Sequence, residues 1–386
     1  MIHLSGATVV LPDRLLAPGR VSIHHGHIID IQTCGPGDDR ELQGHFIVPG
    51  FIDVHVHGIA GTDALDGADA IARIAARLPP FGVTSFCPTS IACTPSALRE
   101  MLTGVRVARE TRRAGAARVL PAHLESNFIN RDFKGAQPED CIRAPREARA
   151  GDFAGTDILA EIAAARADVG IVTVAPEIDG VLDLIADLAA RGHRVSLGHS
   201  GATYAQAREG IAAGARHATH LFNRMTPLGH REPGLVGAVL ESEQVAAEVI
   251  CDGVHVHPAA VRAAVAAKGA GKIIAITDGT AGSGIARGGT ATLGGRRITI
   301  SDAAYLDDGT LAGSVLTMDR AFAMLVMRMG CSLVDAAQMC STTPARELGL
   351  HGFGAIAKGA IADLVILDAR LQVVETYIAG APSMGG

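Results

Sequence analysis

The 386-residue chain lacks tryptophan, and aromatic residues make up only 3% of it. Lysine is also scarce, with only four residues, and the formal net charge is −6. This balance argues against a nucleic-acid-binding surface, which normally carries a basic stripe. No run of about eighteen apolar residues is present, so we expect no membrane-spanning helix. The first residues carry no basic segment followed by an apolar one, so we expect no secretion signal.

The seven cysteines are odd in number and form no CxxC pair. This pattern is typical of reduced thiols, so we expect a soluble cytoplasmic protein without a disulfide framework. Hydrophobic residues make up 48% of the chain, which is enough for a large core. A chain of this length suits one large barrel with a smaller module beside it.

Short β-branched segments at the two ends of the chain predict a small β-sandwich built from both termini. Neither end is long enough to make a domain alone, so we expect residues 1–49 and 351–386 to form this module together. Residues 50–350 then form the main domain. The predicted strands of the module are Ala7–Leu11, Arg20–His24, His27–Ile31, Asp363–Leu367 and Val373–Ile378.

Between the ends, the pattern is strand, loop and helix, repeated. Helices are expected at Ala68–Leu78, Val181–Arg191 and Pro258–Lys268. Eight strands, each followed by a crossover, predict an α/β fold of the (β/α)₈ TIM-barrel type, and an open doubly wound sheet is the alternative. The eight predicted strands are Gly50–Val56, Val83–Cys87, Arg118–Leu124, Gly170–Ala175, Arg194–Leu197, His217–Leu221, Ala247–Cys251 and Lys272–Thr277.

Histidine and acidic residues gather at the ends of these predicted strands, where a barrel builds its active site. His55 and His57 lie two residues apart on one strand, so both imidazoles point the same way. His199 and His220 follow two later strands, and imidazole is a common metal ligand. The alternative for the first pair is two hydrogen-bonded core histidines. Convergence of all four residues predicts a metal site.

Two acids complete the predicted site. Glu125 follows an apolar strand, and because burying an unpaired carboxylate is costly, a divalent cation is its natural partner. The alternative is a structural glutamate paired with an arginine. Asp278 ends another buried strand, where it can accept a proton from a metal-activated water and pass it to a leaving nitrogen. Asp278 could instead be a metal ligand only.

Eight short motifs follow one another along the chain. They are Pro49–Gly58, Val174–Glu177, Gly198–Ser200, Thr219–Asn223, Arg231–Gly237, Asp252–His255, Thr277–Asp278 and Leu311–Met318. The first resembles the first-strand signature of the amidohydrolase superfamily, and the others, in this order, resemble the N-acetylglucosamine-6-phosphate deacetylase family within it. The resemblance covers the chain from about residue 47 to its C-terminus, and the stretch from Gly198 to Gly237 is its most specific part.

The resemblance implies a homodimer with a metal held by Glu125, His199 and His220. His55 and His57 match a pair that binds a second metal in some members. The resemblance also implies that Asp278 is the acid–base group and that the residue matching Arg231 reaches the phosphate in the neighbouring subunit. The alternative for Arg231 is a surface arginine paired with Glu232. His255 is a second catalytic candidate, because with the metal it can polarise the carbonyl oxygen. The implied or candidate substrate contacts are Gln137, Asn223, Arg224, Arg231, His255 and the backbone of Leu311, Ala312 and Gly313.

The chain departs from the family pattern in the loop that follows Glu125. Ser126 and Asn127 replace a Gly-Pro pair, and Gln137 replaces a histidine that touches substrate in the family. Arg224 and Gly279 also replace the usual smaller residue and alanine. The metal and proton-transfer groups are intact, so the chemistry carries over more securely than the identity of the substrate.

The sequence therefore predicts a metal-dependent deacetylase that converts an N-acetylated amino-sugar phosphate, first of all N-acetylglucosamine 6-phosphate, to the free amine and acetate. The cofactor is one or two divalent ions, zinc first, with iron and manganese as alternatives. A second hypothesis is an amidohydrolase acting on another N-acyl sugar, an N-acyl-amino acid or a cyclic amide. The predicted fourth strand lacks the lysine that cyclic amidases often carboxylate. The third hypothesis is a sugar-phosphate sensor without activity.

Overall fold

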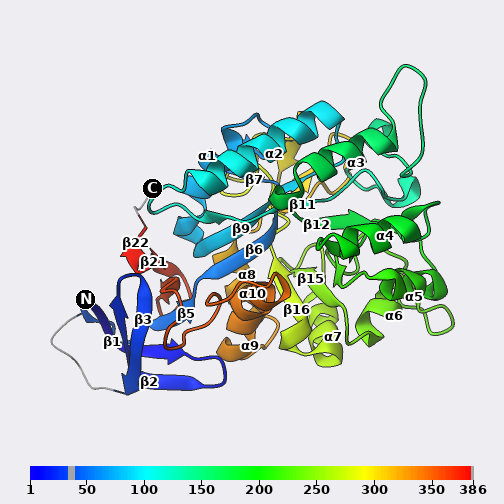
Figure 1. The fold of residues 1–386 in the computed structure, drawn as a ribbon. Helices are drawn as coiled ribbons and strands as arrows, with labels where there is room; N and C mark the ends of the chain where they lie inside the picture. The colour runs from blue at the N-terminus through cyan, green and yellow to red at the C-terminus, as the bar shows by residue number, and fades with distance from the viewer. Residues whose placement is uncertain (34–39, 384–386) are drawn as a thin grey trace.

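The computed structural model describes residues 1–33 and 40–383, and its largest part is a barrel of parallel strands (Figure 1). The strands follow one another around the barrel in chain order, and β6 pairs with β9. The ring closes where Asp278 N, just after the last strand, donates to His55 O at 3.1 Å. The eight positions are taken by β6 (Phe51–Val56), β9 (Val83–Ser90), β11 (Ala122–Leu124), β12 (Val169–Val174), β13 (Arg194–Leu197), β14 (His217–Ala218), β15 (Ala246–Ile250) and β16 (Ile273–Ile276).

This closure confirms the predicted (β/α)₈ barrel over the open sheet. The main difference lies in the third strand, which was expected to run unbroken over Arg118–Leu124. It is split into β10 (Arg118–Val119), which pairs only with β9, and β11, which pairs with β9 and β12. Pro121 lies in the gap, and because proline has no N–H it cannot donate to a ladder there.

Helices surround the barrel, and their buried faces form one continuous core with its strands. The predicted helix Pro258–Lys268 is observed with those bounds, whereas the first two predicted helices are shorter than expected. The helices are α1 (Ala70–Arg77), α2 (Pro95–Glu110), α3 (Gly155–Ala164), α4 (Val181–Ala190), α5 (Tyr204–Ala213), α6 (Gly234–Glu241), α7 (Pro258–Lys268), α8 (Met318–Met327), α9 (Leu333–Ala337) and α10 (Thr343–Glu347). None of these described helices has both the length and the apolar character needed to cross a bilayer.

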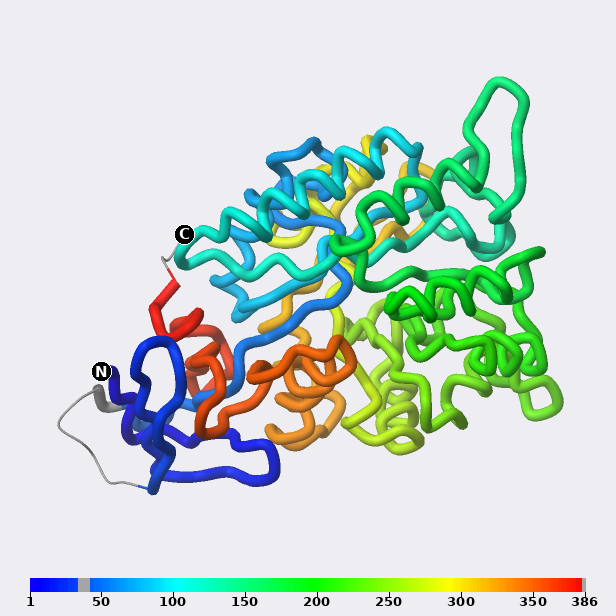
Figure 2. Tube along the Cα trace, in the orientation of Figure 1, coloured from blue at the N-terminus to red at the C-terminus, as the bar shows by residue number. Residues whose placement is uncertain are grey.

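The two ends of the chain meet in a separate sheet, as predicted. Figure 2 shows the N-terminal (blue) and C-terminal (red) segments side by side at one end of the molecule. Strand β5 (Phe46–Pro49) lies between β1 (Ile2–Val10) and β20 (Leu364–Leu367), and it leads directly into the first barrel strand. The remaining strands of this sheet are β2 (Leu15–His24), β3 (His27–Thr33), β4 (Arg40–Glu41), β21 (Val373–Ile378) and β22 (Ala381–Pro382).

The terminal sheet has its own apolar core, which includes Leu4, Val21 and Ile366. Residues 34–39 and 384–386, which the predicted terminal module includes, lie outside the described residues. Two small sheets lie in the loops of the barrel. They are β7 (Gly58–Ile59) with β8 (Thr62–Asp63), and β17 (Thr290–Leu293) with β18 (Arg296–Ile300) and β19 (Ala304–Tyr305).

Candidate metal centre and active site

Glu125 lies at the centre of a buried group of imidazoles, just after β11. Its Oε1 is 2.7 Å from His199 Nε2 and 2.8 Å from His220 Nε2, and the two Nε2 atoms are 3.1 Å apart. Burial would raise the pKa of Glu125, but His199, His220 and His55 hold it well below its usual value. Glu125 is therefore an ionised carboxylate paired with histidines, and the alternative of an arginine-paired structural glutamate is wrong.

His55 and His57, on β6 and just beyond its end, form a second group that shares Glu125. His57 Nε2 lies 3.2 Å from His55 Nε2 and 3.5 Å from Glu125 Oε2. Asp278 Oδ1 completes the group, at 3.1 Å from His57 Nε2 and 3.4 Å from His55 Nε2. His57 thus lies nearest the second oxygen of Glu125, whereas His55 Nε2 lies 3.9 Å from Oε1, the oxygen that also contacts His199 and His220. The six strand-end residues predicted from sequence therefore converge in space.

These side chains fit a divalent metal ion. The ligand atoms of Glu125, His199 and His220 lie within 4.8 Å of one another, and so do those of His55, His57 and Glu125. Burial would lower the pKa values of His57 and His220, but the carboxylates beside them raise both to about 9. The centre therefore attracts positive charge, and its imidazole nitrogens and carboxylate oxygens suit zinc, iron or manganese.

Glu248, which the sequence reading missed, lies beneath the metal centre on β15. It is fully buried, and its two oxygens contact His55 Nδ1 at 2.9 Å and His217 Nε2 at 2.9 Å. The backbone N–H of His220 also donates to Glu248 at 3.2 Å. One carboxylate thus holds a residue from each histidine pair, which is how outer hydrogen bonds orient metal ligands.

Three residues of the centre adopt backbone conformations that non-glycine residues rarely take. The φ angles of His199, His220 and Asp278 are 46°, 30° and 49°, and each residue lies just beyond the end of a barrel strand. Such backbone strain persists only where surrounding contacts hold the residue in place, and it is common at functional sites. At His199 the contacts come from Glu177, whose carboxylate accepts from Ser200 Oγ at 2.7 Å and from Gly201 N at 2.6 Å.

A small cavity of about 90 Å³ opens above the centre. Gly313 lines it with a φ of 70°, and a Cβ there would lie 2.8 Å from Thr280 Cγ2, so glycine is required. His255 is held by Asp252, which accepts from its Nδ1 at 2.6 Å. The predicted substrate contacts that line the cavity are Gln137, Asn223, Arg224, His255, Leu311 and Gly313.

Two of the predicted substrate contacts do not line this cavity. The side chain of Ala312 is buried in a small apolar cluster with Ile91 and Ile298, and a contact through its backbone stays a prediction. Arg231 is exposed on the loop before α6. Within the described part of the chain no carboxylate lies within 4 Å of Arg231, so the predicted alternative, a pair with Glu232, does not form.

The side chains of the divergent loop after Glu125 are buried in the protein interior. Ser126 Oγ donates to Thr173 O at 2.5 Å, and Asn127 Nδ2 donates to Cys93 O and Cys141 O at 2.7 Å each. Both side chains therefore bind backbone away from the cavity. Gln137 does face the cavity, where its amide donates to Glu125 Oε2 and accepts from Ala92 N at 2.7 Å. These contacts make Gln137 a support for Glu125.

Comparisons with known proteins agree with this geometry. The Amidohydrolase family model matches residues 46–384. N-acetylglucosamine-6-phosphate deacetylase of Bacillus subtilis (strain 168) is 34% identical over 96% of this chain and 94% of its own length. N-acetylgalactosamine-6-phosphate deacetylase of Escherichia coli O157:H7 is 36% identical over 98% of this chain and 99% of its own length.

A solved structure of N-acetyl-D-glucosamine-6-phosphate deacetylase from Mycobacterium smegmatis is also similar. That protein is a variant in complex with N-acetyl-D-glucosamine-6-phosphate. It superposes on this chain with a TM-score of 0.89 and 33% identity, over 100% of this chain and 99% of that one. The similarity therefore extends over the barrel and the terminal sheet together.

Proposed function

Because the chain belongs to the N-acetylglucosamine-6-phosphate deacetylase family of amidohydrolases, we propose that it hydrolyses the acetamido group of a hexosamine 6-phosphate. N-acetylglucosamine 6-phosphate is the first candidate, and the products are glucosamine 6-phosphate and acetate. The observation that carries this proposal is the ionised Glu125 between His199 and His220, with Asp278 in the same cavity. The alternatives of a cyclic amidase and an inactive sensor are not favoured by this intact site.

Glu125, His199 and His220 would hold one divalent ion, and His55, His57 and Glu125 would hold a second. A divalent ion supplies Lewis acidity, which lowers the pKa of a water and withdraws electrons from an amide carbonyl. Zinc is the first candidate, and the same ligands also suit iron or manganese. The count of two is supported by the fact that the two ligand groups share one carboxylate.

Asp278 would move the proton. Burial would raise the pKa of this carboxyl, but His55 and His57 lower it below its ordinary value, so it is ionised and able to accept. Its carboxylate takes a proton from the attacking water while oxygen adds to the amide carbon. The same proton then passes to the amide nitrogen as the carbon–nitrogen bond breaks, which releases the amine and acetate.

The other cavity residues would bind and orient the substrate. Asp252 accepts a hydrogen bond from His255 Nδ1 and orients the ring, so that an Nε2–H of the doubly protonated imidazole would donate to the carbonyl oxygen. The phosphate would be held by arginine, whose planar group can bind two phosphate oxygens together. Arg224 lies at the cavity of its own chain, whereas Arg231 does not. We propose that Arg231 reaches the cavity of a second subunit in a homodimer.

The state of the cysteines bears on where the enzyme acts. All six described cysteines are free thiols, and the seventh, Cys34, lies outside the described residues. We therefore propose that the enzyme acts in the cytoplasm, where thiols stay reduced.

The experiment that tests the function is a substrate panel with acetate release as the readout. The panel contains N-acetylglucosamine and N-acetylgalactosamine, each with and without a 6-phosphate, because relatives of nearly equal identity carry the names of both epimers. We expect kcat/KM to be highest for a 6-phosphate sugar. Equal rates with and without phosphate would contradict the phosphate part of the proposal, and absence of acetate from all four would contradict the function.

A further inference from the structure

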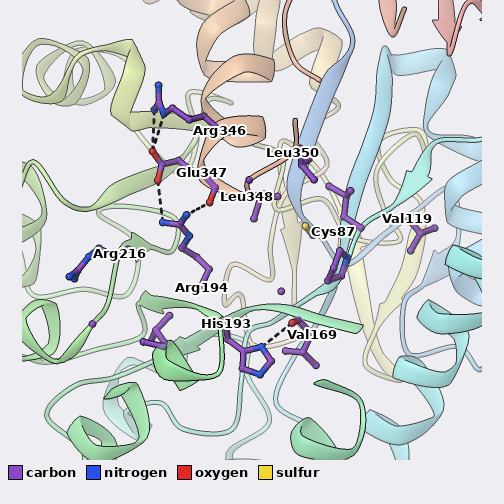
Figure 3. A pocket seen from close by; sticks show the side chains of 18 of the residues that line it. Cys87, Val119, Val169, His193, Arg194, Arg216, Arg346, Glu347, Leu348 and Leu350 are labelled. Atoms are coloured by element: carbon purple, nitrogen blue, oxygen red, sulfur yellow. Dashed lines mark hydrogen bonds and ion pairs between the residues drawn. The ribbon is translucent and has the colours of Figure 1, made fainter. Parts of the chain in front are cut away.

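A second, larger pocket lies at the opposite end of the barrel from the metal centre. Its volume is about 760 Å³, within the usual range of small-molecule sites. It is formed where the barrel strands begin, by Val119, Val169 and Arg194, and by the segment Arg346–Leu350, which spans the C-terminal end of α10 and the residues after it (Figure 3). The proposed reaction takes place at the other ends of these strands and makes no use of this pocket.

The pocket concentrates positive charge in a chain that is negative overall. Figure 3 shows the Glu347 carboxylate between Arg194 and Arg346. Arg194 lies 3.2 Å from one oxygen of Glu347, and Arg346 and Lys272 lie 3.1 and 3.2 Å from the other. Among the described residues that line the pocket, Glu347 is the only acid, so three cations share one carboxylate.

Arg216 adds a fourth cation, which has no acidic partner within 4 Å in the described ranges. One of its nitrogens donates to Ile211 O at 2.7 Å and to Ala215 O at 2.8 Å, which fixes the guanidinium beside the pocket. Burial lowers the pKa of Arg194, Glu347 opposes that effect, and Arg216 adds to it. The partly buried guanidinium groups of Arg194 and Arg216 therefore repel each other. A bound anion would offset that repulsion.

Another part of the pocket wall is apolar and contains Val119, Leu120, Val195, Leu348 and Leu350. His193 and Arg109 also line the pocket, and Arg109 is paired with Asp168. A ligand that suits both parts has an anionic group for the arginines and a flat or aliphatic body for this wall. Inorganic anions alone would leave the apolar wall uncovered.

We propose that this pocket binds a small organic phosphate of nucleotide size, with its phosphate beside the arginines that line the pocket and its body against the apolar residues. Arginine groups bind phosphate through charged, often paired hydrogen bonds. The competing explanation is structural, because the strand-start end of a barrel normally serves stability. Under that explanation the ion pairs of Glu347 hold α10 against the barrel. Those ion pairs require neither an Arg216 without an acidic partner nor an open pocket.

The test is isothermal titration of the metal-loaded, full-length protein with adenosine monophosphate, which joins a phosphate to a flat ring. Adenosine and inorganic phosphate are the two partial probes. The variants are Arg216→Gln and Arg346→Gln in the pocket, Arg224→Gln at the metal-centre cavity, and Arg262→Gln on the exposed face of α7 as the matched control. Melting curves identify any variant that does not fold, and Arg216→Lys replaces Arg216→Gln in that case.

We expect one saturable site for adenosine monophosphate in the wild type. Its affinity falls by at least about tenfold in both pocket variants and stays unchanged in Arg224→Gln and Arg262→Gln, since each lost arginine removes a charged hydrogen bond. Adenosine and inorganic phosphate each bind at least about tenfold more weakly than the nucleotide. The proposal is overturned if the wild type shows no saturable binding, if the pocket variants bind normally, or if Arg224→Gln abolishes binding, which would place the ligand at the metal centre.

Discussion

Glu248 accepts a hydrogen bond from His55 Nδ1 at 2.9 Å in a fully buried position. Burial would raise the pKa of Glu248, but His55, His123 and His217 hold it well below its ordinary value, so Glu248 is an ionised acceptor. The proton of His55 therefore stays on Nδ1, and the lone pair of Nε2 faces the metal centre. The same carboxylate binds the backbone of His220, so it joins both halves of the centre.

Replacing Glu248 with glutamine should weaken the second metal position more than the first. The amide keeps the shape but can no longer fix the His55 tautomer, and such outer contacts change metal affinity or activity by about 10–100-fold. Elemental analysis of the folded Glu248→Gln variant measures its metal content per chain. The control is Glu209→Gln, on the exposed face of α5. Wild-type metal content together with wild-type kcat would contradict the proposed role of Glu248 in orienting His55.

Glu125→Gln should lose bound metal and activity together. The variant removes the charge shared by His199 and His220, and loss of the Lewis acid should lower kcat/KM by at least about a hundredfold. His55→Asn, by contrast, should lose at most the second ion. Metal analysis and acetate release on the same preparations decide this, and a fully loaded, fully active Glu125→Gln enzyme would refute the ligand assignment.

The Asp278→Asn variant should retain its metal but have a much lower kcat. Asparagine has the same size but cannot accept a proton, and general acid–base groups contribute about 10²–10⁴-fold. We expect kcat to fall through that range while metal content matches the wild type. If kcat stays within about tenfold of the wild type, another group carries the proton and Asp278 serves only as a ligand.

Arg231→Ala should raise KM for the phosphorylated sugar by roughly tenfold or more, because charged hydrogen bonds contribute about 1.5–3 kcal/mol. Hydrolysis of the unphosphorylated sugar should change little. The contact is proposed to come from the partner subunit, and mixing offers a direct test. Unfolding and refolding Asp278→Asn with Arg231→Ala should rebuild one intact site in each mixed dimer.

Random mixing of the two variants predicts roughly a quarter of wild-type activity at low substrate concentration, since half of the dimers are mixed and each has one intact site. Mixed protein no more active than the average of the two separate variants would show that Arg231 acts in its own subunit or not at all. If phosphate preference survives in Arg231→Ala, Arg224 at the cavity is the next cation to replace.

The fold could be read from the sequence because its signals are local. Each barrel strand is a short apolar run bounded by turn residues, and the strands at the two termini carry β-branched alternation of their own. The break in the third strand was missed, although Pro121 marked it, because a proline is also tolerated at a strand edge.

The strand-end residues of the site were also predictable, since parallel strands bring their ends to one side. Glu248 was not, because its partners His55 and His217 lie 193 and 31 residues away, and a lone acid inside a strand carries no spacing signal. Its one available signal was an acid inside the apolar run Ala246–Ile250, which burial makes costly without partners. The contact of Gln137 with Glu125 likewise depends on how a loop folds back over the cavity.

The measurement that tests the central claim most directly is acetate release from N-acetylglucosamine 6-phosphate by metal-depleted enzyme, before and after titration with zinc, iron(II) or manganese. The account predicts negligible turnover without metal, restoration as one or two equivalents of ion bind, and equal amounts of acetate and free amine. Full turnover by enzyme whose metal content is shown to be negligible would contradict it. So would metal binding that restores no acetate release in wild-type protein.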